Sequence, residues 1–492
     1  MAVLPLSQIP AFYAKELGGQ AIATIHDDEI MSWGELDRDS TRIALSLRER
    51  GVAVGDFVTL ALPNSNMFFK LTFACWKAGA TPHIVSWRLP KDELAAIVEL
   101  LHPALLVTSS QELSKTFNGV EPESLLNCAA GNLPDVVATY WKAMSSGGST
   151  GRPKIIVDHT PALIEIEGKA MPAMRLPMRS FMLNPGPLYH NAPFLFMHLG
   201  LFQGNSIVGM QRFDAEDALR LIAKHKVEWV NFVPTMMSRI WRLPEDVRAQ
   251  YDLSSLKSVW HMAAPMPPWL KEVWIDWIGA ERVWELYGGT ERNGRTTISG
   301  VEWLAHKGSV GRPTSDHIFR VRDAAGRDLP AGEVGEIYMR PANGEQTYHY
   351  IGAESSVYAD GLESLGDFGS FDDDGYLYLA DRRTDLILCG GANIYPAEVE
   401  CALMEHPGVD VAVVIGLPHE DLGASVHAIV KARPEWLEAM SAETLSTFIR
   451  GKLALYKNPR SYEFTHQDLR DDAGKVRRSQ LRAERVAAVK GT

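Results

Sequence analysis

The chain has 492 residues, which corresponds to roughly two to four structural units at about 100 to 200 residues per domain. Hydrophobic residues make up 46 % of it and charged residues 22 %, a composition that supports a large buried core and excludes a mainly disordered chain. Lysine and arginine number 49 against 61 acidic residues, a net charge of −12, so we expect neither a nucleic acid nor an anionic membrane surface as a partner.

The cysteine pattern and the first residues of the chain bear on where the protein works. The four cysteines, Cys75, Cys128, Cys389 and Cys401, form no CxxC pair, no zinc-ligand spacing and no disulfide framework, which favours a reducing, cytoplasmic setting. The N-terminal segment lacks a basic start followed by an apolar core, and no run of about 18 apolar residues occurs. We therefore expect no export signal and no membrane span.

Helix-like and strand-like segments alternate through the first half of the chain. The expected segments are a helix opening at Ser32, a strand over 57–62, a helix over 66–77, a strand over 82–85, a helix over 91–101 and a strand over 104–107. The alternation returns with a helix over 219–226, a strand over 229–233, a helix over 236–243 and a strand over 259–262. This rhythm is typical of α/β layering with parallel sheets.

The pattern changes near residue 300 and again near residue 384. Short runs at 317–322, 335–339 and 375–379, separated by polar turns, predict antiparallel strands of a β-rich subdomain. After residue 384, an amphipathic stretch at 397–404, a strand at 409–416 and a helix at 442–455 predict a small α+β domain. The predicted fold is thus a large α/β N-terminal domain over 1–383, with layered subdomains and a β-rich subdomain, followed by a C-terminal domain over 384–492.

A glycine-rich loop carries the strongest chemical signal. Residues 145–154 read SSGGSTGRPK, and glycines without a Cβ let backbone N–H groups turn toward a polyphosphate. A Walker P-loop does not fit, because Gly151 is followed by Arg152 and Pro153 and then by a β-branched run. A mobile surface linker and a hydrolase nucleophile elbow at Ser149 are the competing interpretations, and an elbow needs a helix after the serine.

Residues 370–381 loosely resemble a calcium-binding loop. Acidic side chains stand at Asp372 and Asp374, and Gly375 follows. The first ligand position is a serine and the stretch YLYL is strand-like, so a polar hairpin turn is the favoured interpretation.

The loop is one of several segments that together resemble the adenylate-forming superfamily, which comprises acyl-CoA synthetases, peptide-synthetase adenylation domains and luciferases. The other segments are LYHNAPF at 188–194, HMAAPMP at 261–267, ELYGGTE at 285–291, the long run from GDFG to AEVE at 366–400, and AGKVRRSQL at 473–481. The resemblance covers nearly the whole chain. It implies that a carboxylic acid attacks the α-phosphate of ATP to give an acyl-adenylate and pyrophosphate, after which the acyl group passes to a thiol.

The resemblance assigns residues to the nucleotide. Thr290 would hydrogen-bond phosphate and Glu291 would coordinate Mg²⁺. The predicted phosphate-gripping residues are Ser146, Gly147, Gly148, Ser149, Thr150, Gly151 and Lys154, and the predicted adenosine site comprises Ala264, Pro265, Glu285, Tyr287, Asp367 and Arg382. Many relatives carry Ser or Thr where this chain has Gly147, a change that leaves the backbone donors in place.

Further roles follow from the same resemblance. Lys475 would reach the carboxylate and the α-phosphate during adenylation, and His190 would gate the entry of the acid, whereas His198 is expected in the core. The small C-terminal domain would be mobile and alternate between two orientations about a hinge at Thr384. In the second orientation Gly390 and Gly391 would line the tunnel for the thiol.

The acid and the acceptor are the least determined parts of the prediction. His261 and Met262 stand where relatives commonly have small residues, so we expect them in the acyl pocket together with His190. The run over 261–291 is similar to bile-acid and steroid side-chain CoA ligases. The predicted activity is therefore an ATP-dependent, AMP-forming acid–CoA ligase for a bulky ring-bearing acid.

Several alternatives stay open. The acid can instead be an aryl acid or a medium-chain fatty acid, and the acceptor a carrier protein loaded by a stand-alone adenylation enzyme. A catalytically silent nucleotide-binding relative would usually have lost Lys475 or Glu291, and both are present. The expected partners are a small carboxylic acid, ATP, Mg²⁺ and coenzyme A, and a homodimer is compatible with the resemblance.

Overall fold

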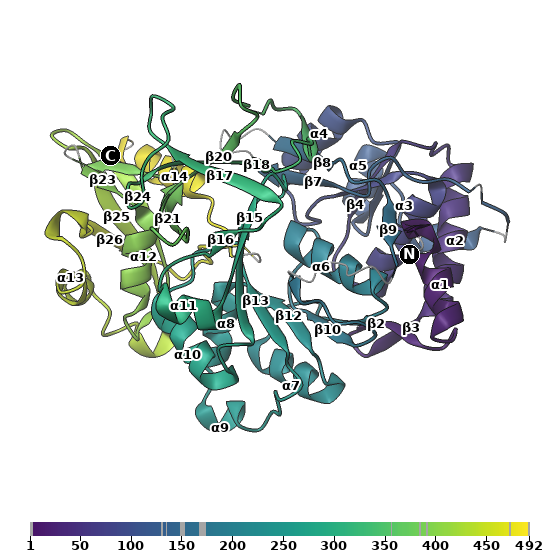
Figure 1. Cartoon of the computed structure of the whole chain (residues 1–492), viewed down its shortest axis with the longest axis horizontal. Helices are drawn as coiled ribbons and strands as arrows, with labels where there is room; N and C mark the ends of the chain where they lie inside the picture. The colour runs from purple at the N-terminus through teal and green to yellow at the C-terminus, as the bar shows by residue number, and fades with distance from the viewer. Residues whose placement is uncertain are drawn as a thin grey trace.

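The computed structural model describes residues 3–128, 131–133, 135–147, 153–166, 174–355, 357–382, 385–389, 392–471 and 474–490. These residues build a large N-terminal domain and a small C-terminal domain, which lies at the left of Figure 1 in yellow-green. Within these ranges, no helix has the length and apolar character needed to cross a membrane.

The first sheet of the N-terminal domain is mainly parallel. Its strand order is β16 (Arg312–Pro313), β15 (Arg295–Ser299), β14 (Val283–Gly288), β13 (Ser258–His261), β12 (Trp229–Phe232), β10 (Phe181–Asn184), β11 (Ser206–Gly209), β2 (Ile22–His26) and β3 (Glu29–Ser32). The strands from β14 through β2 in this order run parallel, and the edge strands β15, β16 and β3 are antiparallel. The predicted parallel α/β layering is confirmed.

The second sheet holds the glycine-rich hairpin. Its strand order is β19 (Tyr348–Ile351), β8 (Pro153–Asp158), β7 (Ala143–Gly147), β5 (Thr81–Ile84), β4 (Phe57–Ala61) and β6 (Leu105–Thr108). β7 and β8 are antiparallel, so the glycine-rich segment leads from a strand into a second strand. A nucleophile elbow requires a helix at this place, which excludes the hydrolase interpretation of Ser149. A separate pair, β1 (Val3–Pro5) and β9 (Leu163–Glu165), joins the N-terminal segment to the region after β8.

Helices fill the space between these sheets and cover their outer faces, as Figure 1 shows for α6 (Asn191–Phe202), which lies between them. α2 (Trp33–Glu49) and α3 (Asn66–Ala78) share this central apolar core with residues of β4, β10 and β11. α7 (Ala215–His225), α8 (Pro234–Trp241) and α10 (Pro268–Ile278) pack on the other face of the first sheet. α4 (Lys91–Leu101) and α5 (Gln111–Phe117) cover the second sheet. The remaining helices of this domain are α1 (Ile9–Glu16), α9 (Glu245–Arg248) and α11 (Gly300–Ala305), with short 3₁₀ turns η1 (Leu6–Gln8) and η2 (Pro122–Asn127).

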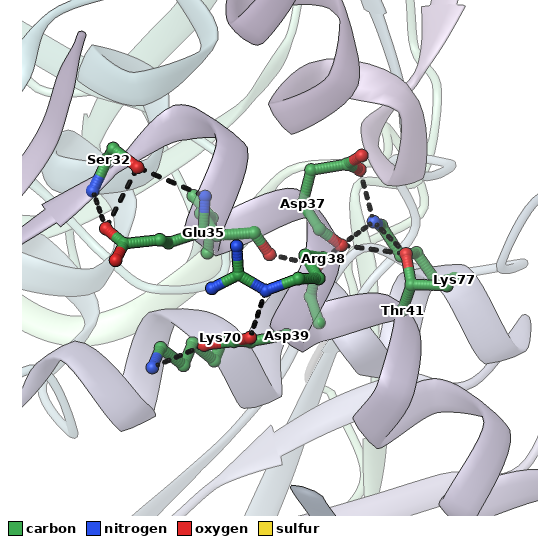
Figure 2. Close-up of polar contacts among 10 residues, drawn as sticks. Ser32, Glu35, Asp37, Arg38, Asp39, Thr41, Lys70 and Lys77 are labelled. Carbon is green, nitrogen blue, oxygen red and sulfur yellow. Dashed lines mark hydrogen bonds and ion pairs between the residues drawn. The ribbon is translucent and has the colours of Figure 1, made fainter. Parts of the chain in front are cut away.

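The predicted helix opening at Ser32 is confirmed, and Figure 2 shows why the helix begins there. The Ser32 side chain accepts from the backbone N–H of Glu35, whose carboxylate in turn accepts from the backbone N–H of Ser32, a capping box. Lys77 of α3 reaches across to α2, where its ammonium donates to the Asp37 carboxylate at 2.6 Å and to the Thr41 hydroxyl at 2.7 Å. A second ion pair, Lys70 Nζ with Asp39 Oδ2 at 2.8 Å, joins the same two helices, so these polar contacts supplement their apolar packing.

The β-rich part forms the predicted antiparallel sheet. Its order is β17 (His317–Arg322), β18 (Gly335–Pro341), β20 (Glu363–Phe371) and β21 (Leu377–Arg382). The calcium-like segment is a hairpin turn between β20 and β21. Asp372 accepts there from the backbone N–H groups of Asp374 and Tyr376, so its carboxylate closes the turn.

The C-terminal domain is an α+β unit, as predicted. Its sheet has the order β23 (Ala392–Ile394), β22 (Ile387–Cys389), β25 (Gly423–Ala432) and β24 (Val409–His419), and β26 (Ser461–Phe464) pairs with β25. The helices are α12 (Pro396–Met404), α13 (Ala442–Arg450) and α14 (Arg478–Lys490), with 3₁₀ turns η4 (Pro434–Trp436) and η5 (Leu455–Lys457). α12, α13 and the sheet enclose an apolar core of their own.

Candidate active site

A cavity of ≈ 2840 Å³ opens at the carboxyl ends of the parallel strands in the first sheet. Ligands of open α/β sheets bind at this edge, because the loops that follow the strands converge there. The walls come from segments far apart in the sequence: the loop after β10, the loops after β12, β13 and β14, strand β20, and the end of the C-terminal domain. Most of the described residues predicted for the site lie in this one cavity.

The loop after β14 forms one side of the cavity. Tyr287, Gly288, Gly289, Thr290 and Glu291 all line it. The Tyr287 hydroxyl donates to Asp367 Oδ2 at 2.7 Å, which joins β14 to β20 of the β-rich sheet. Asp367 pairs with Arg382 along β20 and β21, so the backbones of both predicted ribose residues are adjacent; the Arg382 side chain lies outside what is described.

Glu285 enters the cavity wall from the same strand and is held from behind by a buried lysine. Lys271 Nζ of α10 donates to Glu285 Oε2 at 2.5 Å, and both side chains are buried. Burial lowers the pKa of Lys271, and the negative charge of Glu285 opposes that shift. The pair therefore keeps a carboxylate fixed at the rim of the predicted adenine site.

His261 lies outside the cavity, whereas we expected it in the acyl pocket. Its ring is fully buried, lies 3.7 Å from Glu285 Oε2 on the side of Lys271, and does not line the cavity. Burial, with the positive Lys271 nearby, lowers its pKa well below the usual value, so the imidazole is neutral. Met262, one residue later, does line the cavity, because neighbouring residues at a strand end point to opposite faces.

The loop that follows Met262 has an unusual backbone. Ala263 has φ of +72°, a left-handed conformation that costs a non-glycine residue energy, and Ala264 and Pro265 come next in the cavity wall. Strain of this kind persists where the surrounding structure fixes it. The predicted adenine-facing segment is thus rigidly shaped.

The phosphate side of the cavity begins at the hairpin of β7 and β8. Ser146 and Gly147 of β7 pair with Lys154 and Pro153 of β8, whereas the predicted residues 148–151 lie outside the described part of the chain. Lys154 Nζ lies 3.2 Å from Glu291 Oε1. Lys154 of the hairpin and Glu291, the predicted metal ligand, are therefore in contact at the cavity wall.

His190, the residue predicted to gate the entry of the acid, stands in the cavity wall at the start of α6. His190 is the N-cap residue of α6 and lines the cavity, and its ring packs 4.6 Å from that of Tyr189. Apolar residues in the wall of the same cavity include Met174, Pro193, Leu195, Phe196, Met262 and Leu286. His198 is fully buried, and its Nδ1 makes a hydrogen bond with the Phe194 carbonyl at 2.7 Å. Burial lowers the pKa of His198 to about 3. The prediction that His198 belongs to the core is confirmed.

Lys475 of the C-terminal domain also lines this cavity. Its backbone N–H donates to Asp471 Oδ1 at 2.9 Å and its carbonyl accepts from the Asp471 N–H at 2.9 Å, so a tight turn presents the lysine. Gly474 in that turn has φ of +76°, and a Cβ built on it would lie 3.6 Å from Thr235 Oγ1 of α8. The turn is therefore seated against the N-terminal domain. The predicted hinge Thr384 and tunnel residues Gly390 and Gly391 lie outside the described residues.

A buried ion cluster of Lys142, Asp158 and Arg292 lies next to the site and was not predicted from the sequence. Lys142 and Asp158 are each 1 % exposed, and Lys142 Nζ lies 3.4 Å from Asp158 Oδ2 and 2.7 Å from Asn191 Oδ1. Arg292, directly after Glu291, donates to Asp158 Oδ1 at 2.9 Å. The cluster ties the loop after β14 to α6 beside His190. A lysine inside the apolar run WKAM was the sequence signal, because a buried lysine requires a charged partner.

The oxygen donors of the cavity suit a magnesium–nucleotide complex better than a metal held by protein groups alone. Among the described residues, no group of three or more His, Cys, Asp and Glu side chains could hold a metal. Mg²⁺ in nucleotide sites commonly takes only one or two carboxylates and completes its sphere with phosphate oxygens and water. Glu291, 6 % exposed and in the cavity wall, fits such a ligand. A Cβ on Gly289 would lie 2.9 Å from Glu291 Oε2, so glycine leaves the carboxylate room.

Comparisons with known proteins agree with this geometry. Residues 13–141 and 143–349 match the family model of the AMP-binding enzymes, and residues 398–475 match that of the AMP-binding enzyme C-terminal domain. A feruloyl-CoA synthase of Amycolatopsis sp. is 31 % identical over 94 % of this chain and 95 % of its own length. A fatty acid–acyl-carrier-protein ligase of Streptomyces coeruleorubidus is 29 % identical over 94 % of this chain and 92 % of its own.

A solved structure extends the comparison to the fold. The o-succinylbenzoate coenzyme A synthetase of Bacillus subtilis, in complex with ATP and magnesium, superposes with a TM-score of 0.81 at 26 % identity, covering 98 % of this chain and all of that one. The resemblance to the adenylate-forming superfamily and the fold class are both confirmed, and the enzyme class predicted from them, an AMP-forming acid–thiol ligase, is supported. The chain belongs to the family of AMP-binding enzymes.

Proposed function

We propose that the protein is an AMP-forming acid–CoA ligase that activates a ring-bearing carboxylic acid. The strongest support for this proposal is that residues of both domains line one cavity. Lys475 of the C-terminal domain lines the same cavity as Tyr287, Thr290 and Glu291 of the N-terminal domain. A cation, a hydroxyl and a carboxylate converge there on a space that an ATP molecule and an acid can share.

The residues around the cavity have distinct roles in this proposal. Asp367, positioned by the Tyr287 hydroxyl, accepts hydrogen bonds from the ribose hydroxyls, and Arg382 donates to them. Glu285 lies at the adenine, next to Ala264 and Pro265. The hairpin residues 146–151, Lys154 and Thr290 bind the phosphates. The motif matches support these assignments, and so does the one cavity that Lys154, Glu285, Thr290 and Asp367 line together.

Charge control is the chemical task of the adenylation step. A carboxylate and a triphosphate repel each other, and a bound Mg²⁺ held by Glu291 supplies charge neutralisation. Lys475 stabilises the charge that develops between the acid carboxylate and the α-phosphate. His190 and the apolar wall beside it orient the acid, exclude water and so protect the activated acyl group from hydrolysis.

The thiol step requires the lysine to leave. We propose that the C-terminal domain, beginning at residue 384, rotates about Thr384 after adenylation, and that residues 390 and 391 then line the passage for the CoA thiol. Coenzyme A is the preferred acceptor. The similarity to a ligase whose acceptor is an acyl-carrier protein makes loading of a carrier protein the alternative acceptor.

For the acid, we propose a bile-acid or steroid side-chain type. The run over 261–291 and an acid end walled by Phe196, Leu195 and Met262 support a bulky apolar ring system. Aryl acids form the second candidate class, favoured by the similarity to a feruloyl-CoA synthase and an o-succinylbenzoate synthetase.

A single assay separates these possibilities. The purified protein is incubated with Mg²⁺, ATP and one acid at a time (cholate, a steroid propionate, ferulate, benzoate or octanoate), with and without CoA, and AMP and acyl-CoA are measured by mass spectrometry. We expect acyl-CoA and AMP in equal amounts with a ring-bearing acid. Pyrophosphate exchange without any thioester would move the acceptor to a carrier protein, and no AMP with any acid would contradict the ligase. The Glu291→Gln variant is the inactive control.

A further inference from the structure

The strand β19 joins two parts of the site that are far apart in the sequence. It pairs antiparallel with β8, with Tyr350 opposite Ile156, so it runs along the strand that carries Lys154. Just before it, the Thr347 hydroxyl donates to the backbone carbonyl of Glu291 at 2.7 Å. The segment 347–350 thus holds the loop after β14 against the glycine-rich hairpin.

Tyr350 makes the central contact of this arrangement. Its hydroxyl donates to Glu291 Oε1 at 2.8 Å and accepts from Lys154 Nζ at 3.0 Å. The Lys154 ammonium also lies 4.2 Å from the centroid of the Tyr350 ring, a cation–π contact. One phenol therefore contacts both the phosphate-side lysine and the predicted metal ligand.

The Tyr350 hydroxyl can donate to Glu291 only while it is protonated. A phenol is protonated at neutral pH, so the Tyr350 hydroxyl donates to the carboxylate while it accepts from the Lys154 ammonium. The contacts that the described residues make with this carboxylate are at Oε1, whereas Oε2 lies on the side of Gly289. Tyr350 thereby fixes one carboxylate oxygen, Oε1, and makes no contact with the second, which lies beside Gly289.

From these contacts we propose that Tyr350 is a positioning residue for the magnesium ligand Glu291. In the arrangement described here Lys154 balances the carboxylate. When polyphosphate binds, Lys154 turns to the phosphates, and the tyrosine hydroxyl alone keeps the carboxylate oriented toward the metal. Hydrogen bonds of this kind orient metal ligands in many sites, and their loss typically weakens metal binding about 10- to 100-fold. The inference rests on the proposed function, since it assigns a role within the MgATP site.

The neighbouring strand position offers a matched control. Tyr348 lies two residues away, its ring centroid 4.8 Å from that of Tyr350, and its hydroxyl donates to Glu363 Oε2 at 2.6 Å. Tyr348→Phe therefore removes a phenol of the same strand whose hydroxyl donates to Glu363 and which interacts directly with Tyr350, the residue that contacts Glu291. Both substitutions keep the ring, so the packing of β19 is preserved, and thermal unfolding of each variant verifies this.

The test measures ATP binding by calorimetry as a function of Mg²⁺ concentration, and in EDTA. For Tyr350→Phe we expect the Mg²⁺ concentration at half-saturation to rise about tenfold or more, with ATP binding in EDTA unchanged. Tyr348→Phe should match the wild type in EDTA and raise the half-saturating Mg²⁺ concentration clearly less than Tyr350→Phe, because its hydroxyl does not contact the Glu291 carboxylate. In the Glu291→Gln background, Tyr350→Phe should add no further loss, because the hydroxyl acts through that carboxylate.

Each contrary result has one meaning. Wild-type Mg²⁺ dependence in Tyr350→Phe, or an equal loss in Tyr348→Phe, would overturn the positioning role while leaving the ligase proposal intact. A full additional loss in the Glu291→Gln background would also overturn it. If the wild-type protein binds no ATP in the presence of Mg²⁺, the proposed function fails, and the inference fails with it.

Discussion

Arg242 and Asp410 connect the two domains by an ion pair of 3.0 Å between Arg242 Nη1 and Asp410 Oδ1. Arg242 ends α8 of the N-terminal domain, and its second terminal nitrogen donates to the backbone carbonyl of Val409 at 3.0 Å. Burial lowers the pKa of Arg242 to about 10, so the guanidinium remains charged at neutral pH. A second cross-domain pair, Arg477 with Glu93 at 3.1 Å, lies beside the Lys475 turn.

The first prediction concerns this contact. Arg242→Met should weaken the orientation that places Lys475 in the cavity, because it removes the guanidinium hydrogen bonds to Val409 and Asp410 at the start of β24. We expect pyrophosphate exchange to fall several-fold, while the transfer of a pre-formed acyl-adenylate to CoA is unchanged or faster. Lys226→Met, which removes an exposed pair with Asp252, is the control and should change neither rate. An equal decrease in both half-reactions would contradict an orientation-specific role.

The second prediction concerns Lys475 itself. Lys475→Ala should lower pyrophosphate exchange about 10²- to 10³-fold, since it removes a preorganised cation from the developing charge. The turn that carries it is held by backbone contacts with Asp471, so the melting temperature should not change. Exchange at the wild-type rate in this variant would show that the lysine has no part in adenylation.

Elements with strong local signals were predictable from the sequence. The helix at 91–101 matches α4 at both ends, and Ser32 marks the start of α2 because its capping box is local. The strand expected from Gly375 begins two residues later, at Leu377, because Gly375 has φ of +80° within the turn closed by Asp372. β19 was missed. Its four residues carry little signal of their own, and the strand depends on pairing with β8 far away in the sequence.

In the site, too, residues within motifs were predictable and residues that depend on long-range contacts were not. Motif residues such as Tyr287, Glu291 and Lys475 lie in one cavity, as the resemblance implied. His261 and Met262 were both expected in the acyl pocket, but consecutive residues at a strand end face opposite sides, and the sequence alone did not tell which of them faces inward. Tyr350 and Lys271 act through long-range contacts that no motif records.

The third prediction tests the buried ion cluster. Asp158→Asn leaves the fully buried Lys142 without its carboxylate partner, and breaking a buried pair in this way typically costs about 3–5 kcal/mol of unfolding free energy. Urea denaturation measures the loss. Asp28→Asn, which removes an exposed carboxylate paired with Lys224, is the control and should have no measurable effect. A change in Asp158→Asn no larger than that of the control would contradict a structural role for the cluster.

The same carboxylate predicts an acid limit of stability. The positive charges of Lys142 and Arg292 outweigh the cost of burial and lower the pKa of Asp158 to about 2, below its unfolded value of 3.8. A lowered carboxyl pKa contributes stability that is complete above the unfolded value and is lost as the pH falls toward the folded value. We expect wild-type unfolding free energy to decline between about pH 4 and pH 2, with a shallower decline in Asp158→Asn. Parallel curves for the two proteins would contradict this assignment.

The last prediction distinguishes Met262 from His261, which were both expected in the acyl pocket. Met262 lines the cavity, and the proposed function assigns it to the acid. Met262→Ala should therefore lower kcat/KM for the preferred acid about 10- to 200-fold, the range for losing apolar contact in a pocket, and leave the KM for ATP unchanged. His261→Asn should leave the ranking of acids as it is, because the ring faces Lys271 and Glu285 beneath the strand. Any effect of that variant should appear in ATP binding through Glu285. Steady-state kinetics over the acid panel distinguish the two, and a changed acid preference in His261→Asn would place its side chain in the pocket after all.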